Sequence, residues 1–264
     1  MTETEPPLKI TVATVTYNAA ALIEATIASV ERQNYPWVEH LIVDGNSRDD
    51  TLAHVHRYQE RNSVAPVRHE IVCISEPDDG LYDAMNKALE LATGSYIVFL
   101  NAGDRLHDAD TLSRVARAAQ GTAELPAVVY GNTDLVDAEG RFVRHRRLAP
   151  PPRLTWRSFA RGMLVCHQAF YARTDLARAC RYDLRYRFSA DFDWCVRLLK
   201  EAARRRLPVQ GVGAVTADYL SEGLTTQNHQ ASLRERFAIM AHHYGLVPTL
   251  LRHAWFVVRA VVKK

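Results

Sequence analysis

The sequence lacks the features that would assign it early to a membrane, secreted or nucleic-acid-binding class. No apolar run reaches the ~18 residues of an ordinary transmembrane helix. Residues 1–7 are acidic and contain proline, unlike a secretory signal peptide. The net charge of the 264-residue chain is only +3, so its composition indicates no nucleic-acid partner. These absences favour a globular protein, which we expect in the cytoplasm.

Cysteine is also scarce, and its spacing indicates no redox or metal motif. The chain has four cysteines, and none of them belongs to a CxxC pair. Cys73 lies in an apolar strand pattern and Cys195 in a helical one, with Cys166 and Cys180 between them. Buried free thiols in a reducing compartment are the simplest interpretation.

Glycine is missing where a dinucleotide-binding enzyme would need it. Residues 9–15 are mostly apolar and β-branched and predict the first strand. The segment TYNAA, residues 16–20, follows it without the GxGxxG fingerprint, which argues against an NAD-binding Rossmann enzyme. The same segment lacks the glycine-rich basic loop with which sugar nucleotidyltransferases usually hold a triphosphate.

The first part of the chain alternates strand and helix patterns three times in about ninety residues. This alternation predicts a mostly parallel sheet with helices on both faces. The predicted strands are residues 9–15, 39–44, 69–75 and 95–100, and the predicted helices are 20–33, 50–58 and 81–92. The pattern then loosens, with a helix predicted at 111–120, strands at 127–131 and 168–172, a hairpin segment at 141–147 and a helix at 191–201.

Polar residues follow each of the first four predicted strands. Ligands of such sheets bind beyond the carboxyl ends of the strands. These ends are residues 14–18, 44–46, 76–80 and 101–104, and three of them carry aspartate. We therefore expect the polar strand ends to form one ligand site.

The aspartates at the second and third strand ends have two interpretations each. Asp44 either accepts hydrogen bonds from a ribose or a base, or caps the following helix from a turn. Asp78 and Asp79 precede Gly80 and a predicted helix, so one of them is expected to cap the helix while the other faces the ligand.

Asp104 is a lone carboxylate after a buried strand, in the run Asn101-Ala102-Gly103-Asp104. Direct contact between this carboxylate and a diphosphate would be repulsive, so Mg²⁺ or Mn²⁺ is expected between them. Such cations take oxygen ligands, often one or two carboxylates with phosphate oxygens and water. Asn101 would supply a carbonyl oxygen or hold a ligated water. The alternative is a carboxylate that serves only the turn.

Two later segments carry further candidates. Asp191 and Asp193 begin an amphipathic helix, where one suits a helix-dipole partner and the other a general base for an acceptor hydroxyl. His167 and Gln168 lie beside an apolar strand and are either satisfied structural residues or contacts to a sugar. Glu222 belongs to a polar loop that could cover the site.

The end of the chain is apolar, aromatic and basic. Residues 246–262 contain ten large apolar side chains, interleaved with Arg252 and Arg259 and followed by Lys263 and Lys264. Such a helix either lies in a membrane interface or docks on the core. The first alternative would place the protein at the inner face of the plasma membrane, as a peripheral protein.

Taken together, these segments resemble the family 2 glycosyltransferases of the GT-A fold, in four blocks that occur in the same order. The blocks are TVTYNAAALIEATIASVERQNYPWVEHLIVDGNSRDDT, SEPDDGLYDAMNKALELATGSYIVFLNAGD, CHQAFYAR and SADFDWCVRL. The first two cover about the first 110 residues, and the others extend the resemblance to about residue 200. The most similar members are bacterial enzymes that build exopolysaccharide, O-antigen or glycolipid glycans.

The resemblance implies an α/β protein of the GT-A fold, with a mostly parallel Rossmann-like sheet and a C-terminal helical extension. It implies a nucleotide-sugar-binding half at residues 1–110, an acceptor-binding half at 111–225 and C-terminal helices at 226–264. The donor would be a UDP- or GDP-sugar, the cofactor a divalent cation, Mg²⁺ or Mn²⁺, and the acceptor a glycan or lipid-linked glycan.

The resemblance also implies roles for individual residues. Only the last acid of the family's usual Asp-x-Asp or Asp-Asp-like motif remains, so Asp104 would hold the metal. Asp191 aligns with the catalytic base, with Asp193 as the second choice. The nucleotide-sugar contacts would be Thr14, Thr16, Asn18, Asp44, Asp78, Gly80 and Asn101, and the contacts to the acceptor or donor sugar would be His167, Gln168 and Glu222.

The implied reaction is a single in-line displacement with inversion at the anomeric carbon, assisted by the metal. Two other functions remain open at this point. One is a non-catalytic nucleotide-sugar-binding partner of a glycan assembly complex, and the other is a sugar nucleotidyltransferase.

Overall fold

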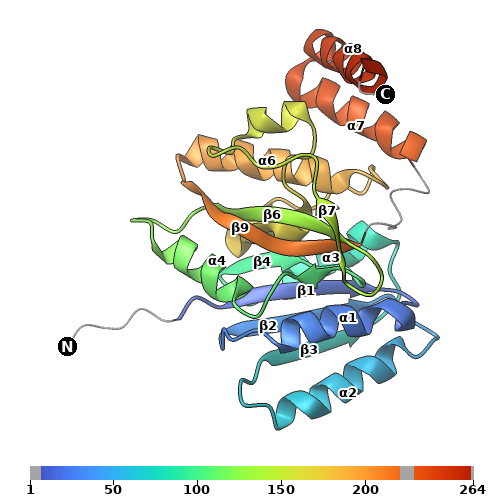
Figure 1. The fold of residues 1–264 in the computed structure, drawn as a ribbon, viewed down its shortest axis with the longest axis vertical. Helices are drawn as coiled ribbons and strands as arrows, with labels where there is room; N and C mark the ends of the chain where they lie inside the picture. The colour runs from blue at the N-terminus through green and yellow to red at the C-terminus, as the bar shows by residue number, and fades with distance from the viewer. Residues whose placement is uncertain (1–6, 221–228, 263–264) are drawn as a thin grey trace.

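The computed structural model describes residues 7–220 and 229–262. Nine strands within these residues form one sheet, in the order β3-β2-β1-β4-β8-β6-β9-β5, with β7 paired to β6 (Figure 1). The strands are β1 (Ile10–Thr16), β2 (Val38–Asp44), β3 (Glu70–Ser75), β4 (Tyr96–Phe99), β5 (Arg105–Leu106), β6 (Val128–Val136), β7 (Phe142–His145), β8 (Phe170–Arg173) and β9 (Val209–Leu220).

The four strands of the N-terminal half are parallel, as predicted. Thr16 of β1 pairs in register with Asp44 of β2, which pairs with Ser75 of β3. On the other side of β1, Ala13 is level with Phe99 of β4. This register brings the carboxyl ends of the four strands, and the polar residues after them, to one edge of the sheet.

Alternating side chains bury both faces of this sheet. Leu41 and Val43 of β2 belong to the core under α3 (Leu81–Leu91) and α6 (Ala190–Arg205), whereas Ile42 packs with α1 (Ala20–Glu31) and α2 (Thr51–Ser63). Such alternation is the two-residue period of a strand. Figure 1 shows α1 and α2 together over β1 to β3, with α4 (Thr111–Gln120) farther along the sheet.

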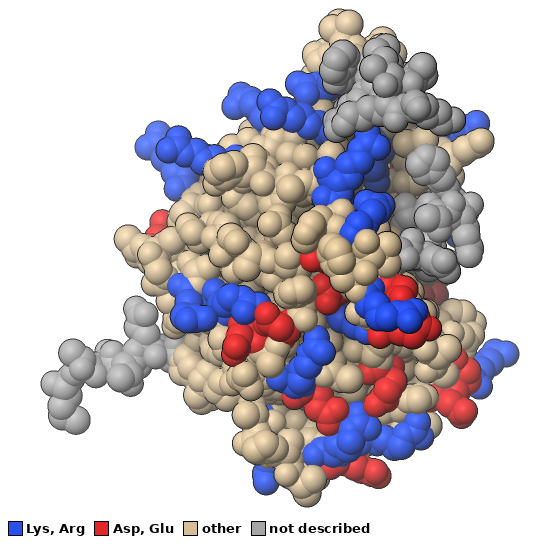
Figure 2. Space-filling model, in the orientation of Figure 1, with Lys and Arg blue, Asp and Glu red and all other residues tan. Residues whose placement is uncertain are grey.

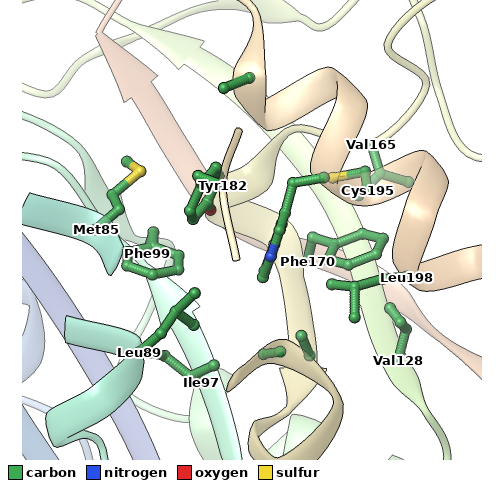
Figure 3. Close-up of a cluster of buried hydrophobic side chains, with 14 of the residues drawn as sticks. Met85, Leu89, Ile97, Phe99, Val128, Val165, Phe170, Tyr182, Cys195 and Leu198 are labelled. Carbon is green, nitrogen blue, oxygen red and sulfur yellow. The ribbon is translucent and has the colours of Figure 1, made fainter. Parts of the chain in front are cut away.

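The largest core lies between the sheet and the pair α3 and α6. Figure 3 shows Met85 and Leu89 of α3 across from Cys195 and Leu198 of α6, with Phe99 of β4 among them. Trp194 is fully buried there and stacks on Tyr182, with ring centroids 4.8 Å apart. This packing fixes the start of α6, and therefore Asp191, relative to the strand ends.

Two helices follow the sheet and form the predicted C-terminal extension. They are α7 (His229–Tyr244) and α8 (Leu246–Val262), which pack on each other beyond α6 (Figure 1). Short helices η1 (Trp156–Arg161), η2 (His167–Ala169) and α5 (Thr174–Ala179) connect the elements of the C-terminal half. Among the described residues, none of the helices has the length and apolarity needed to cross a bilayer. The four cysteines are free thiols, but the expected burial holds only for Cys195, because Cys73, Cys166 and Cys180 are partly exposed.

Candidate active site

The loops after β1, β2 and β3 meet at the carboxyl edge of the sheet. A Cβ atom on Gly45, the residue after Asp44, would lie 2.5 Å from Asp78 Oδ2 and 3.4 Å from Tyr17 Cδ2. Only glycine therefore fits between these two side chains. The side chain of Tyr17 is 62% exposed, so its ring is available to a ligand. Tyr17 was not predicted from the sequence, because a single tyrosine after a strand carries no motif of its own.

Asp44 is fully buried and its carboxylate is bonded within the protein. It accepts hydrogen bonds from Ser47 N at 2.9 Å, Ser47 Oγ at 2.5 Å and Ser75 Oγ at 2.6 Å. The carboxylate thus joins the loop after β2 to the end of β3. It does not cap α2, whose N-cap residue is Asp50.

The two threonines of β1 lie in different surroundings. Thr14 is fully buried, and its Oγ1 lies 3.0 Å from Nε2 of His40 inside the sheet. Thr16 is at the end of the strand, and its buried Oγ1 has no hydrogen-bond partner among the described residues. An unpaired buried hydroxyl is costly, so Thr16 is the better placed of the two to bond a ligand.

Asn18 and Gly80 shape the loops in which they lie. Asn18 has a φ of 47°, and its Oδ1 accepts a hydrogen bond from Arg48 N at 2.9 Å. Gly80 has a φ of +112°, in the region that favours glycine. Asp78 accepts the Gly80 N–H at 2.9 Å, and α3 has no side-chain cap, so the expected capping by Asp78 or Asp79 is wrong. Gly80, and neither aspartate, is the N-cap residue of α3.

A second group of site residues surrounds Asp191 at the start of α6. His167 Nδ1 lies 3.2 Å from Asp191 Oδ2, and the Tyr82 hydroxyl donates to Asp191 Oδ1 at 3.3 Å. Asn101 Nδ2 lies 3.3 Å from His167 Nε2. Because an ionised carboxylate only accepts, the proton on His167 belongs on Nδ1, and Nε2 accepts from the Asn101 amide. Three distant segments thus form one chain of hydrogen bonds that ends at Asp191.

These contacts keep Asp191 ionised. Burial alone would raise its pKa, but the hydrogen bond and electrostatic effect of His167, the charge of Arg236 and the Phe192 N–H together lower it. Asp191 is therefore a carboxylate over a wide pH range, as a proton acceptor has to be.

Asp104 is buried in a third group, next to the second. Its Oδ2 accepts from Gln168 Nε2 at 2.7 Å, and its Oδ1 accepts from Leu220 N at 3.3 Å. The Thr26 hydroxyl of α1 holds the same loop by bonding the Asp104 carbonyl at 2.8 Å. Burial raises the pKa of Asp104 to about 6, although the Gln168, His167 and Leu220 contacts oppose the rise.

The three groups are continuous. Helix α3 begins directly after Asp78 and Gly80 and carries Tyr82, which bonds Asp191. The loop after β4 carries both Asn101 and Asp104, which bond the neighbours His167 and Gln168. Of the predicted site residues, Thr14 faces the sheet interior, and Glu222 lies outside the described residues.

Asp193 has structural partners instead of site partners. Its Oδ2 accepts from Arg197 Nε at 2.6 Å, and its Oδ1 lies 2.7 Å from His243 Nε2 of α7. Burial alone would raise the pKa of Asp193, but the contacts with His243 and Arg197 outweigh this effect and lower the pKa. With both oxygens engaged at the α6–α7 contact, Asp193 is a weaker candidate for the base than Asp191.

The site offers few protein ligands for a divalent cation. The described residues contain no group of three His, Cys, Asp or Glu side chains that could hold a metal. They do offer the Asp104 carboxylate and the Asn101 Oδ1, which is buried without a partner in the described part of the chain. Mg²⁺ and Mn²⁺ are often held by one carboxylate, with phosphate oxygens and waters completing the shell. The donor set thus fits a cation that binds together with a diphosphate.

Comparison with known families and proteins confirms the class of the enzyme. Residues 11–181 match the profile described as Glycosyl transferase family 2. The chain belongs to glycosyl transferase family 2. This family 2 glycosyltransferase is 37% identical over 194 residues to a PGL/p-HBAD biosynthesis glycosyltransferase of Mycobacterium bovis, a match that covers 71% of this chain and 68% of the relative.

Solved structures confirm the fold. The Staphylococcus aureus protein TarS, residues 1–349, matches with a TM-score of 0.67 at 17% identity, over 94% of this chain and 72% of that one. A mannosyltransferase of Pyrobaculum calidifontis, solved with GDP-Man and Mn²⁺, matches with a TM-score of 0.60 at 20% identity, over 95% and 75%. TarS has also been solved with UDP-GlcNAc. The predicted α/β GT-A fold with its helical extension is thus confirmed.

Proposed function

We propose that this family 2 glycosyltransferase moves a sugar from a UDP- or GDP-sugar to a hydroxyl of a cell-envelope glycan or glycolipid, with inversion. The observation that carries the proposal is the ionised Asp191, bonded to His167 and Tyr82 next to the loop of Asn101 and Asp104. The names of the M. bovis relative and of the ligands in TarS and the mannosyltransferase support the acceptor and donor classes.

In this proposal, the nucleotide lies against the N-terminal half, residues 1–110, where the loops after β1, β2 and β3 meet. The exposed ring of Tyr17 stacks on the base, and the unpaired Thr16 hydroxyl and Asp78 accept or donate hydrogen bonds at its edge or at the ribose. Asp44 contributes by holding these loops together through Ser47 and Ser75. The acceptor lies against residues 111–225.

The cation, Mg²⁺ or Mn²⁺, would be held by Asp104 and Asn101 together with the donor. When bound, it would neutralise negative charge that develops on the leaving diphosphate. Because Asp104 is buried, its negative charge is poorly solvated, and a bound cation would stabilise that charge.

Asp191 acts as the base of a single displacement. The acceptor hydroxyl transfers its proton to the Asp191 carboxylate while its oxygen forms a bond to the anomeric carbon of the sugar. The bond between that carbon and the diphosphate oxygen breaks from the opposite side, so the configuration inverts. His167 orients the carboxylate through Nδ1, and Asn101 fixes the tautomer of His167 through Nε2.

The substitution Asp191→Asn tests the base, because it keeps the shape of the side chain and removes the proton acceptor. We expect donor binding within about twofold of the wild type and turnover reduced about 10³-fold or more. Asp193→Asn is the matched control on the same helix turn and should keep most of the turnover. Retained turnover in Asp191→Asn, measured by release of the nucleoside diphosphate, would assign the base to another group.

The acceptor class suggests contact with a membrane, and α8 offers a surface for it. Leu246, Val247, Leu250 and Leu251 are 56%, 66%, 50% and 69% exposed and share one face of the helix. The opposite side of α8 packs on α7 and η1, so the helix is docked and still presents an apolar face. Arg157 and Arg161 are exposed on η1, which contacts α8. In the upper part of the face shown in Figure 2, the charged side chains are mainly Lys and Arg.

We propose that this face rests on the inner leaflet of the plasma membrane, with the arginines near anionic headgroups. Sedimentation with vesicles of phosphatidylglycerol and phosphatidylcholine tests it. The double substitution Val247→Glu, Leu251→Glu should reduce the bound fraction about 10-fold or more. Val64→Glu, at an 81% exposed valine after α2, is the matched control and should bind like the wild type. Equal binding of all three proteins would refute the membrane contact.

A further inference from the structure

Helix α7 is fixed at the start of α6 by one carboxylate. Glu235 of α7 accepts the backbone N–H groups of Arg187, Phe188 and Ser189 at 2.8, 2.8 and 2.9 Å. The Ser189 hydroxyl lies 3.0 Å from that of Ser232, one turn earlier on α7, and both serines are buried. Because Ser189 precedes Asp191 by two residues, α7 has one defined position relative to the proposed base.

The residue after Glu235 is Arg236, whose charge acts on Asp191 and whose Nε lacks a hydrogen-bond partner among the described residues. The Cζ atom of Arg236 lies 5.7 Å from the centroid of the Phe192 ring, next to Asp191. Its Nε is buried and has no hydrogen-bond acceptor among the described residues. The nearby Arg197 differs, because its guanidinium bonds Asp193, the Arg181 carbonyl and the Cys180 sulfur. A buried N–H without an acceptor costs free energy, which a ligand can recover.

The charge balance of the site indicates what that ligand is. Three site carboxylates, Asp78, Asp104 and Asp191, are negative when ionised, and the diphosphate of a donor adds at least two further negative charges. The protein supplies a sparse cation site, with one carboxylate ligand among the described residues. A guanidinium next to Asp191 can supply the positive charge that a leaving diphosphate needs, and its planar donors match phosphate oxygens.

We propose that Arg236 binds phosphate oxygens of the nucleoside diphosphate, so that the C-terminal extension completes the donor site. This inference rests on the proposed function. It assigns to α7 a ligand contact that lies outside the four sequence blocks and outside the matched family range of residues 11–181. Glu235 is then a positioning residue, because it sets where the neighbouring arginine lies.

Calorimetric titration of UDP and GDP, with uridine and guanosine as phosphate-free probes, tests the assignment. In Arg236→Gln, we expect the affinity for the preferred nucleoside diphosphate to fall about 10- to 100-fold and the affinity for its nucleoside to stay within twofold. Arg236→Lys should recover part of the loss, because it keeps the charge without the planar fork. Arg234→Gln, at an exposed arginine on the same helix, is the matched control and should bind like the wild type.

The possible outcomes separate this inference from the function on which it rests. Failure of the wild type to bind either nucleotide overturns both. Wild-type binding that Arg236→Gln retains overturns the inference alone, even if that variant is less stable. An increase confined to the KM of a phosphorylated acceptor would place Arg236 at the acceptor and would also overturn the donor assignment. A selective loss of diphosphate affinity with intact nucleoside affinity supports it.

Discussion

Replacing Asp104 by asparagine should stabilise the folded protein at neutral pH while it impairs the site. The carboxylate is buried, and burial raises its pKa from 3.8 to about 6. A raised carboxylate pKa means that the folded state binds the proton more tightly than the unfolded state does. The stability contributed by the protonated form is complete below about pH 3.8 and is lost as the pH rises through about 6. Ionised Asp104 therefore destabilises the fold.

The size of the effect follows from the two pKa values. Each pKa unit corresponds to about 1.4 kcal/mol, so a rise from 3.8 to about 6 costs about 3 kcal/mol when both states are ionised. About 1 kcal/mol of this cost is already present at pH 4.5. Asparagine keeps an oxygen for Gln168 and loses the bond from Leu220 N, a loss of about 1 kcal/mol. The free energy of unfolding should thus rise by about 2 kcal/mol at pH 8 and stay nearly unchanged at pH 4.5.

Urea unfolding in the presence of a chelator, followed by tryptophan fluorescence at both pH values, measures this difference. Asp44→Asn is the matched control, since Asp44 is equally buried but accepts three hydrogen bonds, and it should be destabilised at both pH values. A loss of stability in Asp104→Asn that is the same at pH 4.5 and pH 8 would refute the reasoning. Adding Mn²⁺ with UDP or GDP should raise the stability of the wild type more than that of Asp104→Asn, because only the wild type keeps the carboxylate ligand.

Three further predictions concern the nucleotide loops and the base. His167→Phe removes the hydrogen bond that lowers the pKa of Asp191, so the acidic limb of kcat/KM should move to higher pH; an unmoved limb would contradict the pairing. Gly45→Ala places a Cβ 2.5 Å from Asp78 Oδ2 and should weaken nucleotide binding about 10-fold by calorimetry, whereas unchanged affinity would show that the loops do not form the site. Tyr17→Ala should lose about 10-fold in nucleotide affinity while Tyr17→Phe keeps it, as stacking requires; equal losses would point to the hydroxyl instead.

The N-terminal half was predictable because local patterns determine it. Each of its strands is short, apolar and bounded by polar turns, and each helix between them has an apolar face. The hairpin predicted at residues 141–147 is also present, with Leu135 opposite Arg144. By contrast, β9 was not predicted, because two glycines interrupt its apolar pattern and its pairing with β6 joins segments about eighty residues apart. The two-residue strand β5 exists only through its pairing with β9.

The strand-end aspartates of the candidate site could be named from the sequence, but their contacts could not. Topology alone brings the strand-end aspartates to one edge, which is why Asp44, Asp78 and Asp104 could be named. Their surroundings depend on distant partners, such as Gln168 for Asp104 and Ser75 for Asp44. No local pattern encodes those pairings. Arg236 could not be found from the sequence for the same reason, since a single arginine on a helix has no motif until the position of the helix is known.

The three amides that Glu235 accepts have a practical consequence for shortened forms of this protein. A truncation before α7 would remove a helix pair that looks dispensable, because the sheet and the four sequence blocks would remain. It would also leave the amides at residues 187–189, in the segment that leads into α6, without their acceptor. Such a fragment could keep its sheet and still misplace Asp191, the proposed base, so inactivity in a truncated preparation would say little about the chemistry of the intact enzyme.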